Sequence, residues 1–527
     1  MHQIVFFLDY ISNILPDLGV DNVMQCTFEE FAKQVIGDNG IKIESSSDKL
    51  ASIINHKSSF NENEISNKIS AFKSSMTFKK ILDKYLENIE ENYLPECDLK
   101  VGNIVILSHE KLVKNFKDCL KGKPLEEKLK VFKLRLKMLF ENNQELIEKM
   151  IKVEREKELK TLDKNLPETE YEMKKMAIFS KYSESLKLIE NNGKKVIDDY
   201  IKKVKKPNSL IYYKDFISKL SKYIDRGDDN LSLVKDIQEN LLKKKNNKQV
   251  EYEDLAALMY ISNKLKDIEK QTDDMYPKYF VIDEAQDYSP FQFWVLQNIL
   301  KSNSMTILGD ISQGIYSYRG VKDWNEINDE VFNGQAIILD LNKSYRNTIE
   351  IMEKGNDVIY NIKDKIKAKL AEPVIRNGKP VTIAKQEEKQ LALVISNKIK
   401  ELEKDNRFNI AVITKTLQEA TTLHRKLTNN GINAVLISDK SNEYTGGVSV
   451  IPSYLVKGLE FDSVILSNAG KEQYANNELD AKLLYVAITR AMHTLDIYYI
   501  NEESELLRKR EEEIISFKEE NSSFQEK

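Results

Sequence analysis

This chain of 527 residues contains little cysteine, glycine and proline, and its net charge is small. The three cysteines, Cys26, Cys97 and Cys119, lie far apart and lack metal-ligand spacing, which excludes a disulfide scaffold and predicts thiols in a reducing cytoplasm. A net charge of −4 excludes attraction to nucleic acid by overall charge, so any basic surface must be local. No apolar run is long enough to cross a membrane. We therefore expect a cytoplasmic protein without a membrane partner.

The abundant residues are typical of a soluble, helix-rich globular protein. The chain is 41% hydrophobic and 31% charged, and its length suits about three domains. Residues 61–250 are rich in lysine, and from Leu125 to Leu166 apolar residues recur at helical spacing. This pattern predicts long amphipathic helices, as a helical hairpin or a coiled-coil arm. An accessory domain with a solvated charged surface and an arm that binds a partner are equally good interpretations.

After residue 278, short apolar and β-branched runs alternate with helical patterns. Such runs between helices are typical of buried strands in doubly wound parallel sheets, so the predicted fold class is α/β. Strands are predicted at residues 278–282, 305–308, 335–339, 410–414, 434–438, 448–451, 463–467 and 495–500.

The first string that indicates chemistry is KYFVIDEAQD at residues 278–287. In an open α/β sheet, ligands lie beyond the carboxyl ends of the strands. Asp283 at such an end suits Mg²⁺, and Glu284 beside it suits a general base for an attacking water. The alternative is an acidic cap of the helix expected after Pro290. The full string is much rarer than an acidic pair and favours function.

The string MTILGDISQGIYSYRG at residues 305–320 again places an acidic residue after a strand. Gln313 is suited to contact a phosphate or the attacking water. Tyr316, Tyr318 and Arg319 form an aromatic and basic cluster that can stack on unpaired bases. A turn with ordinary core tyrosines explains this string equally well when it is taken alone.

Three further strings are weak individually. In LNKSYRNT, Tyr345 offers a ring face to a purine and Arg346 offers a donor fork to phosphate. In VSVIPSYLVKGLEFDSVIL, Gly458 permits close backbone approach near Glu460, although a plain strand connection is the better interpretation. In LLYVAITRAMHTLDIYY, Arg490 is predicted on a helix, where it can face a cleft and stabilise charge on a transferred phosphoryl group. An isolated arginine on a helix is more often simply solvated.

The five strings together resemble a known family. In their order along the chain, DEAQD, GDxxQxIY, SYRN, KGLEFD and YVAITRA resemble motifs II to VI of the UvrD/Rep superfamily 1 helicases, clearly over residues 278–500. The resemblance implies two RecA-like P-loop NTPase domains and ATP-dependent DNA helicase or translocase activity. It also implies ATP and Mg²⁺ as cofactors and single-stranded DNA as a partner.

The resemblance assigns expected roles to the matching residues. Asp283 is expected to bind Mg²⁺ and Glu284 to act as the general base. Gln313 is expected to sense the γ-phosphate, which Arg346 and Arg490 are expected to contact.

Four more residues receive roles from the same motifs. Tyr345 is expected to stack on adenine. Glu460, in the string that contains Gly458, is expected to contact the ribose or to couple the site to DNA. Tyr318, next to Arg319, matches the base-stacking aromatic residue of the family.

An earlier string, CTFEEFAKQVI at residues 26–36, resembles the TFHSL segment that touches the nucleic-acid backbone. Thr27 and Phe28 occupy the matching places. Glu29 and Glu30 replace a histidine and a serine, and acids that face phosphate would repel it.

One motif of the family does not occur in the 527 residues. This is GxxxxGK[ST], whose backbone amides and lysine cradle the phosphates of ATP. The expectation is a family member that lacks its first β-α unit and everything upstream of it, with little ATP affinity and almost no turnover alone.

Several features resemble the HelD group of helicase-like ATPases, which bind RNA polymerase and recycle it. They are the short separation of SYRN from KGLEFD, an insertion of about 190 residues before DEAQD, and the strings FLDYISNILPDLG, IDEAQDYSPFQ and VIPSYLVKGLEFD. The resemblance implies core RNA polymerase as a second partner. The expected domains are residues 1–60 and 251–340 for the first RecA-like domain, 61–250 for its helical insertion, 341–503 for the second and 504–527 for a charged tail.

Two other interpretations stay open. The chain can be a nucleotide-incompetent fragment that binds polymerase or DNA, and an in-frame GxGKT upstream together with ATP hydrolysis would separate this from a truncated enzyme. It can also be a metal-dependent hydrolase that uses only Asp283 and Glu284. That interpretation leaves Gln313, Arg346 and Arg490 unexplained.

Overall fold

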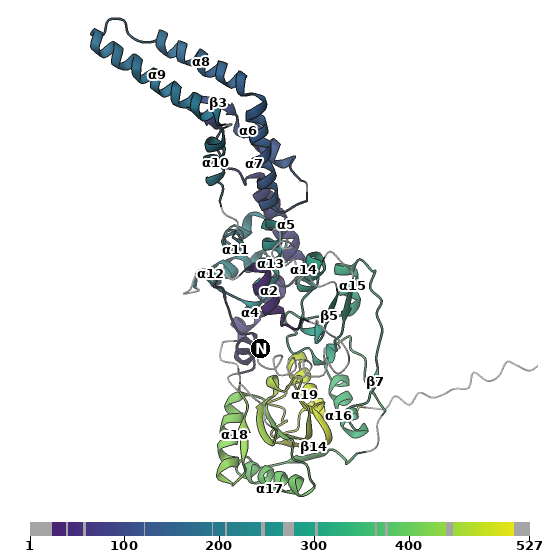
Figure 1. Cartoon of the computed structure of the whole chain (residues 1–527). Helices are drawn as coiled ribbons and strands as arrows, with labels where there is room; N and C mark the ends of the chain where they lie inside the picture. Colours follow the sequence, from purple (N-terminus) through teal and green to yellow (C-terminus); the bar gives the residue numbers. More distant parts are fainter. Residues whose placement is uncertain are drawn as a thin grey trace, which may run out of the picture.

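A computed structural model gives the fold of the protein. It describes residues 24–37, 40–55, 60–120, 122–191, 193–205, 208–243, 248–266, 279–300, 304–363, 366–374, 378–438 and 446–510. The string FLDYISNILPDLG and residues 511–527 of the predicted tail lie outside the described residues. Figure 1 shows three parts in a row: a long helical arm, a region around strand β5, and a region around strand β14.

The region around β14 is built on a six-stranded, wholly parallel sheet with the order β11-β12-β10-β13-β14-β9. Its strands are β9 (Thr382–Lys385), β10 (Ile410–Thr414), β11 (Ala434–Leu436), β12 (Val448–Pro452), β13 (Phe461–Leu466) and β14 (Ala491–Tyr499).

Alternate residues of β10 enter two different hydrophobic clusters, so this sheet is covered on both faces. Ala411 and Ile413 pack with helices α16 (Ile349–Tyr360) and α19 (Glu478–Ile488). Ile410 and Val412 pack with α17 (Leu391–Lys404) and α18 (Leu417–Asn429). Burial on both faces explains why these strands are continuous apolar runs, and it confirms the predicted α/β class.

The region around β5 holds a two-stranded parallel sheet, β5 (Phe280–Ile282) and β6 (Met305–Ile307). Around it lie α2 (Phe28–Ile36), α13 (Leu255–Leu265), α14 (Pro290–Leu300) and α15 (Trp324–Phe332). Helix α3 (Ser46–Ile54) buries Leu50 and Ile54 in the core of the region around β14. The short parallel pair β1 (Lys42–Ile43) with β4 (Gln249–Val250) connects two segments of the region around β5. Another short parallel pair, β7 (Lys343–Ser344) with β8 (Glu372–Pro373), lies beside α16 of the region around β14.

The strand predicted at residues 335–339 is wrong, because the structure has no regular element there. Ile337 and Leu339 are 87% and 81% exposed. A strand requires a neighbour for its backbone N–H and C=O groups, and the described residues offer this segment no such neighbour.

The arm and its base comprise α4 (Phe60–Lys73), α5 (Met76–Glu91), α6 (His109–Lys117), α7 (Leu125–Asn142), α8 (Gln144–Lys160), α9 (Glu168–Glu190), α10 (Lys194–Lys202), α11 (Ser209–Ser218) and α12 (Val234–Lys243). An antiparallel pair, β2 (Leu99–Val101) and β3 (Ile104–Leu107), interrupts the helices. Helices α8 and α9 form the hairpin at the far end (Figure 1). Ile147 and Ile151 of α8 are buried in the same core cluster as Ile178 and Tyr182 of α9.

A buried ionic cluster fixes the base of the arm to α13. Lys73, at the end of α4, lies 2.8 Å from Glu251 and 2.9 Å from Asp254. The hydroxyl of Tyr213 in α11 donates to Asp254 over 2.5 Å. A buried charge network of this kind holds its elements in one arrangement, because breaking it leaves an uncompensated charge.

Candidate functional site

The predicted acidic pair lies directly after β5, at the carboxyl end of the strand. The backbone N–H of Glu284 donates to the carboxylate of Asp283 over 2.8 Å. Glu284 has φ 51°, in the left-handed region that non-glycine residues rarely occupy. This conformation turns the chain sharply after the strand. Strain of this kind is concentrated at functional sites.

Lys457 reaches this acidic turn from the other α/β region. It follows the 3-10 turn Ser453–Leu455, and its Nζ lies 3.0 Å from Glu284 Oε2 and 2.7 Å from Asp287 Oδ2. Burial raises the pKa of Glu284, but Lys457, the hydrogen bond from Gln286 and the charge of Arg490 together hold the pKa below its usual value. Burial wins at Asp287, whose pKa is raised despite the same lysine.

Gln286 connects the acidic turn to the segment after β6, and the sequence reasoning gave it no role. Its side chain donates to Glu284 over 2.6 Å and accepts from the backbone N–H of Asp310 over 3.0 Å. Its backbone carbonyl accepts from Val321 N–H over 3.0 Å. A Cβ on Gly320 would lie 2.4 Å from that carbonyl oxygen, so this position requires glycine. The only signal for Gln286 in the sequence was its position within the strings DEAQD and IDEAQDYSPFQ.

Arg490 and Gln313 meet between the two regions. Arg490 Nη2 donates to Gln313 Oε1 over 2.7 Å, and its Nε donates to the Val486 carbonyl over 3.1 Å. Arg490 was predicted on a helix, but α19 ends at Ile488 and Thr489 caps it. The arginine therefore projects from the turn between α19 and β14, where it is 2% exposed.

The second predicted arginine lies close enough to influence the first. Burial and the nearby charge of Arg346 lower the pKa of Arg490 to about 10. Arg346 is half-exposed and pairs with Glu460 over 2.8 Å. A buried guanidinium beside a second cation is suited to receive an anion, because an anion would relieve both the desolvation and the repulsion.

Tyr345 and its neighbours are held in place by a backbone anchor. The Asn347 side chain donates to the carbonyls of Thr489 and Ala491 over 2.9 and 2.7 Å. This fixes the Tyr345–Arg346 pair beside the turn that carries Arg490. The Tyr345 ring is 61% exposed, so its face is open to a ligand.

Gly458 has a backbone conformation that favours glycine, and its predicted close approach to a nucleotide stays a prediction. Its φ is 80°, and a Cβ there would meet nothing within 4 Å. The positive φ by itself favours glycine here, independently of any ligand.

The predicted metal position depends on Asp283. Across the part of the chain that the structure describes, no three His, Cys, Asp or Glu side chains converge as a metal site. A lone carboxylate still suits Mg²⁺ in a nucleotide complex, because Mg²⁺ takes its other ligands from water and phosphate oxygens. Burial raises the pKa of Asp283, although the hydrogen bond from the Glu284 backbone N–H opposes it.

Thr27 and Phe28, predicted to touch nucleic acid, lie in the interior. Thr27 caps α2 in a reciprocal capping box, in which the Glu30 carboxylate accepts from Thr27 N–H over 2.7 Å. Phe28 is 5% exposed and packs edge-on against Tyr288. Glu30 is thus engaged in the cap, whereas the sequence reasoning had it face phosphate. The contact of Thr27 and Phe28 with nucleic acid stays a prediction.

Arg319 is also buried. Its Nη1 lies 3.2 Å from Glu253, and its guanidinium lies 4.1 Å from the ring of Tyr252 and 4.4 Å from that of Tyr316. Tyr318 beside it is half-buried. Arg319 therefore joins the segment after β6 to the segment that precedes α13, and its contact with nucleic acid remains a prediction.

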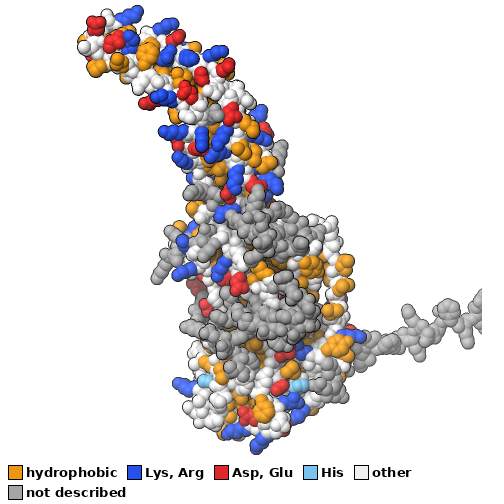
Figure 2. Space-filling view, viewed as in Figure 1, with side chains coloured by type: hydrophobic (Ala, Val, Ile, Leu, Met, Phe, Trp, Pro, Cys, Tyr) orange, Lys and Arg blue, Asp and Glu red, His pale blue; other side chains and the backbone are white. Residues whose placement is uncertain are grey.

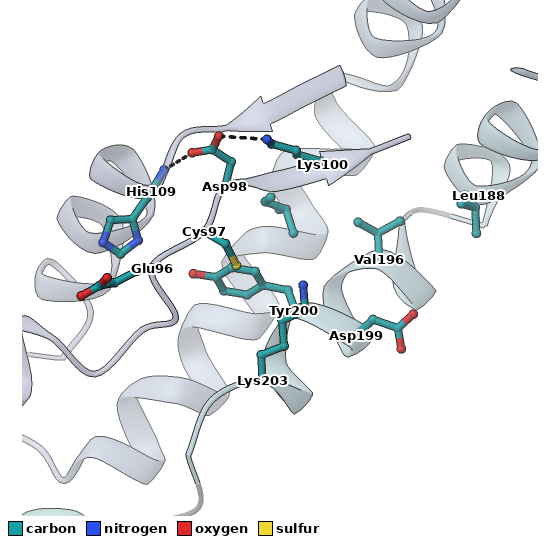
Figure 3. Close-up of a pocket in the computed structure, with 11 residues that line it drawn as sticks. Glu96, Cys97, Asp98, Lys100, His109, Leu188, Val196, Asp199, Tyr200 and Lys203 are labelled. Atoms are coloured by element: carbon teal, nitrogen blue, oxygen red, sulfur yellow. Dashed lines mark hydrogen bonds and ion pairs between the residues drawn. The ribbon is translucent and has the colours of Figure 1, made fainter. Parts of the chain in front are cut away.

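A cavity of about 620 Å³ lies in the arm, away from all predicted site residues (Figure 3). The hydroxyl of Tyr200 is buried there without a hydrogen-bond partner. Asp98 is engaged, because it accepts from the His109 backbone N–H over 2.9 Å and pairs with Lys100 over 3.5 Å. The wall is formed by residues 96–100, His109, Leu188, Val196, Asp199, Tyr200 and Lys203.

Three models of helicase-family domains match this chain. A model of the UvrD/REP helicase N-terminal domain matches residues 9–329, and models of the UvrD-like helicase C-terminal domain match residues 339–445 and 447–498. Within the described residues, no helix is long and apolar enough to cross a membrane.

Individual relatives match over shorter segments. A probable DNA helicase II homolog of Mycoplasma capricolum is 30% identical over 178 residues, which are 33% of this chain and 24% of that protein. The ATP-dependent DNA helicase PcrA of Bacillus subtilis is 28% identical over 130 residues, 24% of this chain and 17% of that protein. The chain thus matches about a quarter or less of the length of these relatives.

One solved structure is similar in sequence. It is the C-terminal domain of a possible DNA helicase from Lactobacillus, with 30% identity over 32% of this chain and 95% of that chain, and a TM-score of 0.26. The N-terminal family model covers more than half of the 527 residues. The chain therefore belongs to the UvrD/Rep helicase family.

Proposed function

We propose that this chain contributes to an ATP-dependent DNA helicase or translocase whose nucleotide site lies between its two α/β regions. The observation that carries the proposal is the contact of Arg490 with Gln313, which brings a buried arginine of one region to the segment after β6 of the other. Sites between two RecA-like domains use such arginines to stabilise charge on a transferred phosphoryl group.

Each residue of the site would have a role that suits its chemistry. Asp283 would hold Mg²⁺, and Arg346 and Arg490 would bind the terminal phosphate. Tyr345, with its exposed ring, would stack on the base. ATP would supply the phosphoanhydride bond that is cleaved. Glu284 would accept the proton of the attacking water.

Lys457 sets a condition on that last step. Its ion pair neutralises Glu284, and a carboxylate whose pKa is held low is a weak base. We propose that Glu284 gains basicity when Lys457 moves away, through a shift of the two regions relative to one another. We propose that bound DNA causes this shift.

A second candidate function is supported by the arm and by the composition of the chain. The 527 residues hold no GxxxxGK[ST] string, so phosphate binding rests on the arginine side alone. Meanwhile Met150, Met173, Met176 and Phe179 at the end of the arm are 42% to 70% exposed. Flexible, exposed methionines are frequent at protein-binding surfaces. We propose, as the HelD resemblance implies, that the arm contacts core RNA polymerase in the cytoplasm.

The two candidates are separated by measuring ATP hydrolysis of the full chain alone, with single-stranded DNA, and with core RNA polymerase. Hydrolysis that Glu284→Gln abolishes and Glu30→Gln leaves unchanged supports the enzyme. Turnover that survives Glu284→Gln rules out the assigned base. Polymerase binding without hydrolysis supports the second candidate and excludes the first for this chain.

A further inference from the structure

The segment that joins α15 to β7 exposes an unusual run of apolar side chains. Ile337, Leu339 and Leu341 are 87%, 81% and 91% exposed, and Ile338 between them is 41% exposed. In Figure 2, orange side chains line the right-hand edge of the molecule, where Figure 1 shows the connection from α15 to β7. A contiguous exposed apolar patch of this kind marks an interaction surface.

The backbone of this segment is as open as its side chains. Ala336, at its start, is held by the side chain of Asn328, which accepts from the Ala336 N–H over 2.9 Å and donates to its carbonyl over 3.2 Å. Among the described residues, the N–H and C=O groups of residues 337–341 have no hydrogen-bond partner. A row of free backbone donors and acceptors is a template on which another strand can pair.

The pairing of β7 with β8 shows which edge of the segment is free. The segment continues directly into β7, and β8 covers one edge of that strand. The Glu372 N–H donates to the Asn342 carbonyl over 2.8 Å, and the Val374 N–H donates to the Ser344 carbonyl over 3.0 Å. Backbone groups of alternate residues point to opposite edges of a strand. In a strand that continues β7 upstream, the groups of odd-numbered residues therefore point to the edge away from β8.

This edge lacks the usual protection against pairing. Proteins block exposed edge strands with proline, with lysine or with a bulge. Residues 337–341, IILDL, contain neither proline nor lysine. Their one charge, on Asp340, is paired with Lys369 of the same molecule. No uncompensated charge in the segment therefore repels a second strand.

We propose that residues 337–341 pair as an antiparallel strand with the same residues of a second copy of this chain. In the register centred on Leu339, this residue lies opposite its own equivalent, and Ile337 lies opposite Leu341. These are the odd-numbered residues, so each opposed pair exchanges backbone hydrogen bonds. Asp340 lies opposite Ile338, which keeps the two carboxylates from facing each other.

The segment fits a second copy because it is complementary to itself. A twofold contact requires one surface to serve both partners. In this register, each side chain of the exposed apolar face meets an apolar side chain, and the single acid has no like charge opposite it. Because β8 flanks β7 in each copy, the joined sheet has four strands. Three or more strands form a stable sheet, whereas two alone are marginal.

The size of the contact sets its expected strength. Stable interfaces between proteins bury about 1,200–2,000 Å² in total, and a pair of five-residue strands buries less. The dissociation constant is therefore expected to be about 1–100 µM. This association goes beyond the proposed nucleotide site and requires neither ATP nor DNA.

The test is sedimentation equilibrium of the full chain without nucleotide, over about 1–200 µM. Leu339→Lys and Leu339→Glu each place like charges opposite one another, and each should raise the dissociation constant at least about tenfold. An equimolar mixture of the two variants pairs opposite charges and should restore the dimer. The matched control Leu242→Lys, on α12, changes a leucine that is 83% exposed and should leave the dissociation constant unchanged.

Amide exchange tests the register. In the unaltered chain, exchange at Ile337, Leu339 and Leu341 should slow as the concentration rises, whereas exchange at Ile338 and Asp340 should not. Equal slowing at all five residues would overturn the proposed register.

Three results of sedimentation would overturn the inference itself. They are a monomer at every concentration, a dimer of unchanged strength in Leu339→Lys, and a mixture of the two charged variants that stays monomeric. A monomer that binds a synthetic peptide of residues 3–9, QIVFFLD, and loses that binding in Leu339→Lys would also overturn it. That result would assign the edge to the first residues of the chain.

Discussion

Replacing Lys457 by methionine should destabilise the junction of the two α/β regions in a pH-dependent manner. The substitution keeps the length of the side chain and removes both ion pairs, with Glu284 and with Asp287. The side chain of Asp287 is 19% exposed and that of Glu284 is 40% exposed, so the charge left at Asp287 is the costly one. Breaking a fully buried pair costs about 3–5 kcal/mol. Partial exposure here reduces the expected cost to about 1–3 kcal/mol.

The sign of the pH dependence follows from Asp287. Its pKa is raised in the folded protein by burial even with Lys457 present, and removal of the lysine raises it further. A carboxyl group with a raised folded pKa costs stability above its unfolded pKa, and the cost is relieved as pH falls through the folded value. The difference in stability between Lys457→Met and the unaltered chain should therefore shrink between pH 7.5 and pH 5.5.

Differential scanning calorimetry without Mg²⁺ or nucleotide measures this difference as a shift in melting temperature. For a domain of this size, about 1–3 kcal/mol corresponds to a shift of roughly 2–10 °C. The second substitution Asp287→Asn, added to Lys457→Met, should restore part of the loss because it removes the uncompensated charge. A shift that is the same at both pH values, or a double variant no more stable than Lys457→Met, would refute the reasoning.

Three further substitutions test the frame of the site. Gly320→Ala should lower the melting temperature and loosen the contact with Gln286. The control Gly227→Ala has open space around it and should leave the melting temperature unchanged. Equal melting temperatures of the two variants would contradict the close approach at Gly320. Asn347→Ala removes both hydrogen bonds to the turn before β14 and should lower the free energy of unfolding by about 1–3 kcal/mol, measured by calorimetry. Amide exchange at residues 489–491 should become faster. Unchanged exchange would count against the anchoring role of Asn347. Thr27→Ala should lower the free energy of unfolding by about 0.5–2 kcal/mol. Full stability in Thr27→Ser would identify helix capping as the cause.

The sequence was most informative where strands are buried on both faces. The runs at residues 410–414 and 448–451 coincide with β10 and β12, because a strand covered by helices on two sides must be apolar throughout. β9 was not predicted, since the edge strand TIAK is short and half polar. The run at residues 335–339 has the same composition as the buried strands. Composition cannot reveal whether a neighbouring strand is available.

The site was predictable as a set of strings but not as a set of contacts. Spacing placed Glu284 and Arg490 in order along the chain, yet nothing local indicates that Lys457 pairs with Glu284 across two regions. The burial of Arg319 was equally invisible, because its partner Glu253 precedes it by 66 residues. Contacts of this kind depend on tertiary packing, which overrides the surface preference of a charged side chain.

The fixed base of the arm has a mechanical consequence. Lys73, Tyr213 and Asp254 tie the arm to α13 through buried bonds, and α13 also packs against α2 and α14 of the region around β5. Helix α9 alone has 23 residues and extends about 35 Å. A tilt of about 5° at the base would displace the far end of such a lever by about 3 Å. A small reorientation beside β5 therefore produces a larger displacement at the far end of the arm, which would exert a force on a molecule bound there.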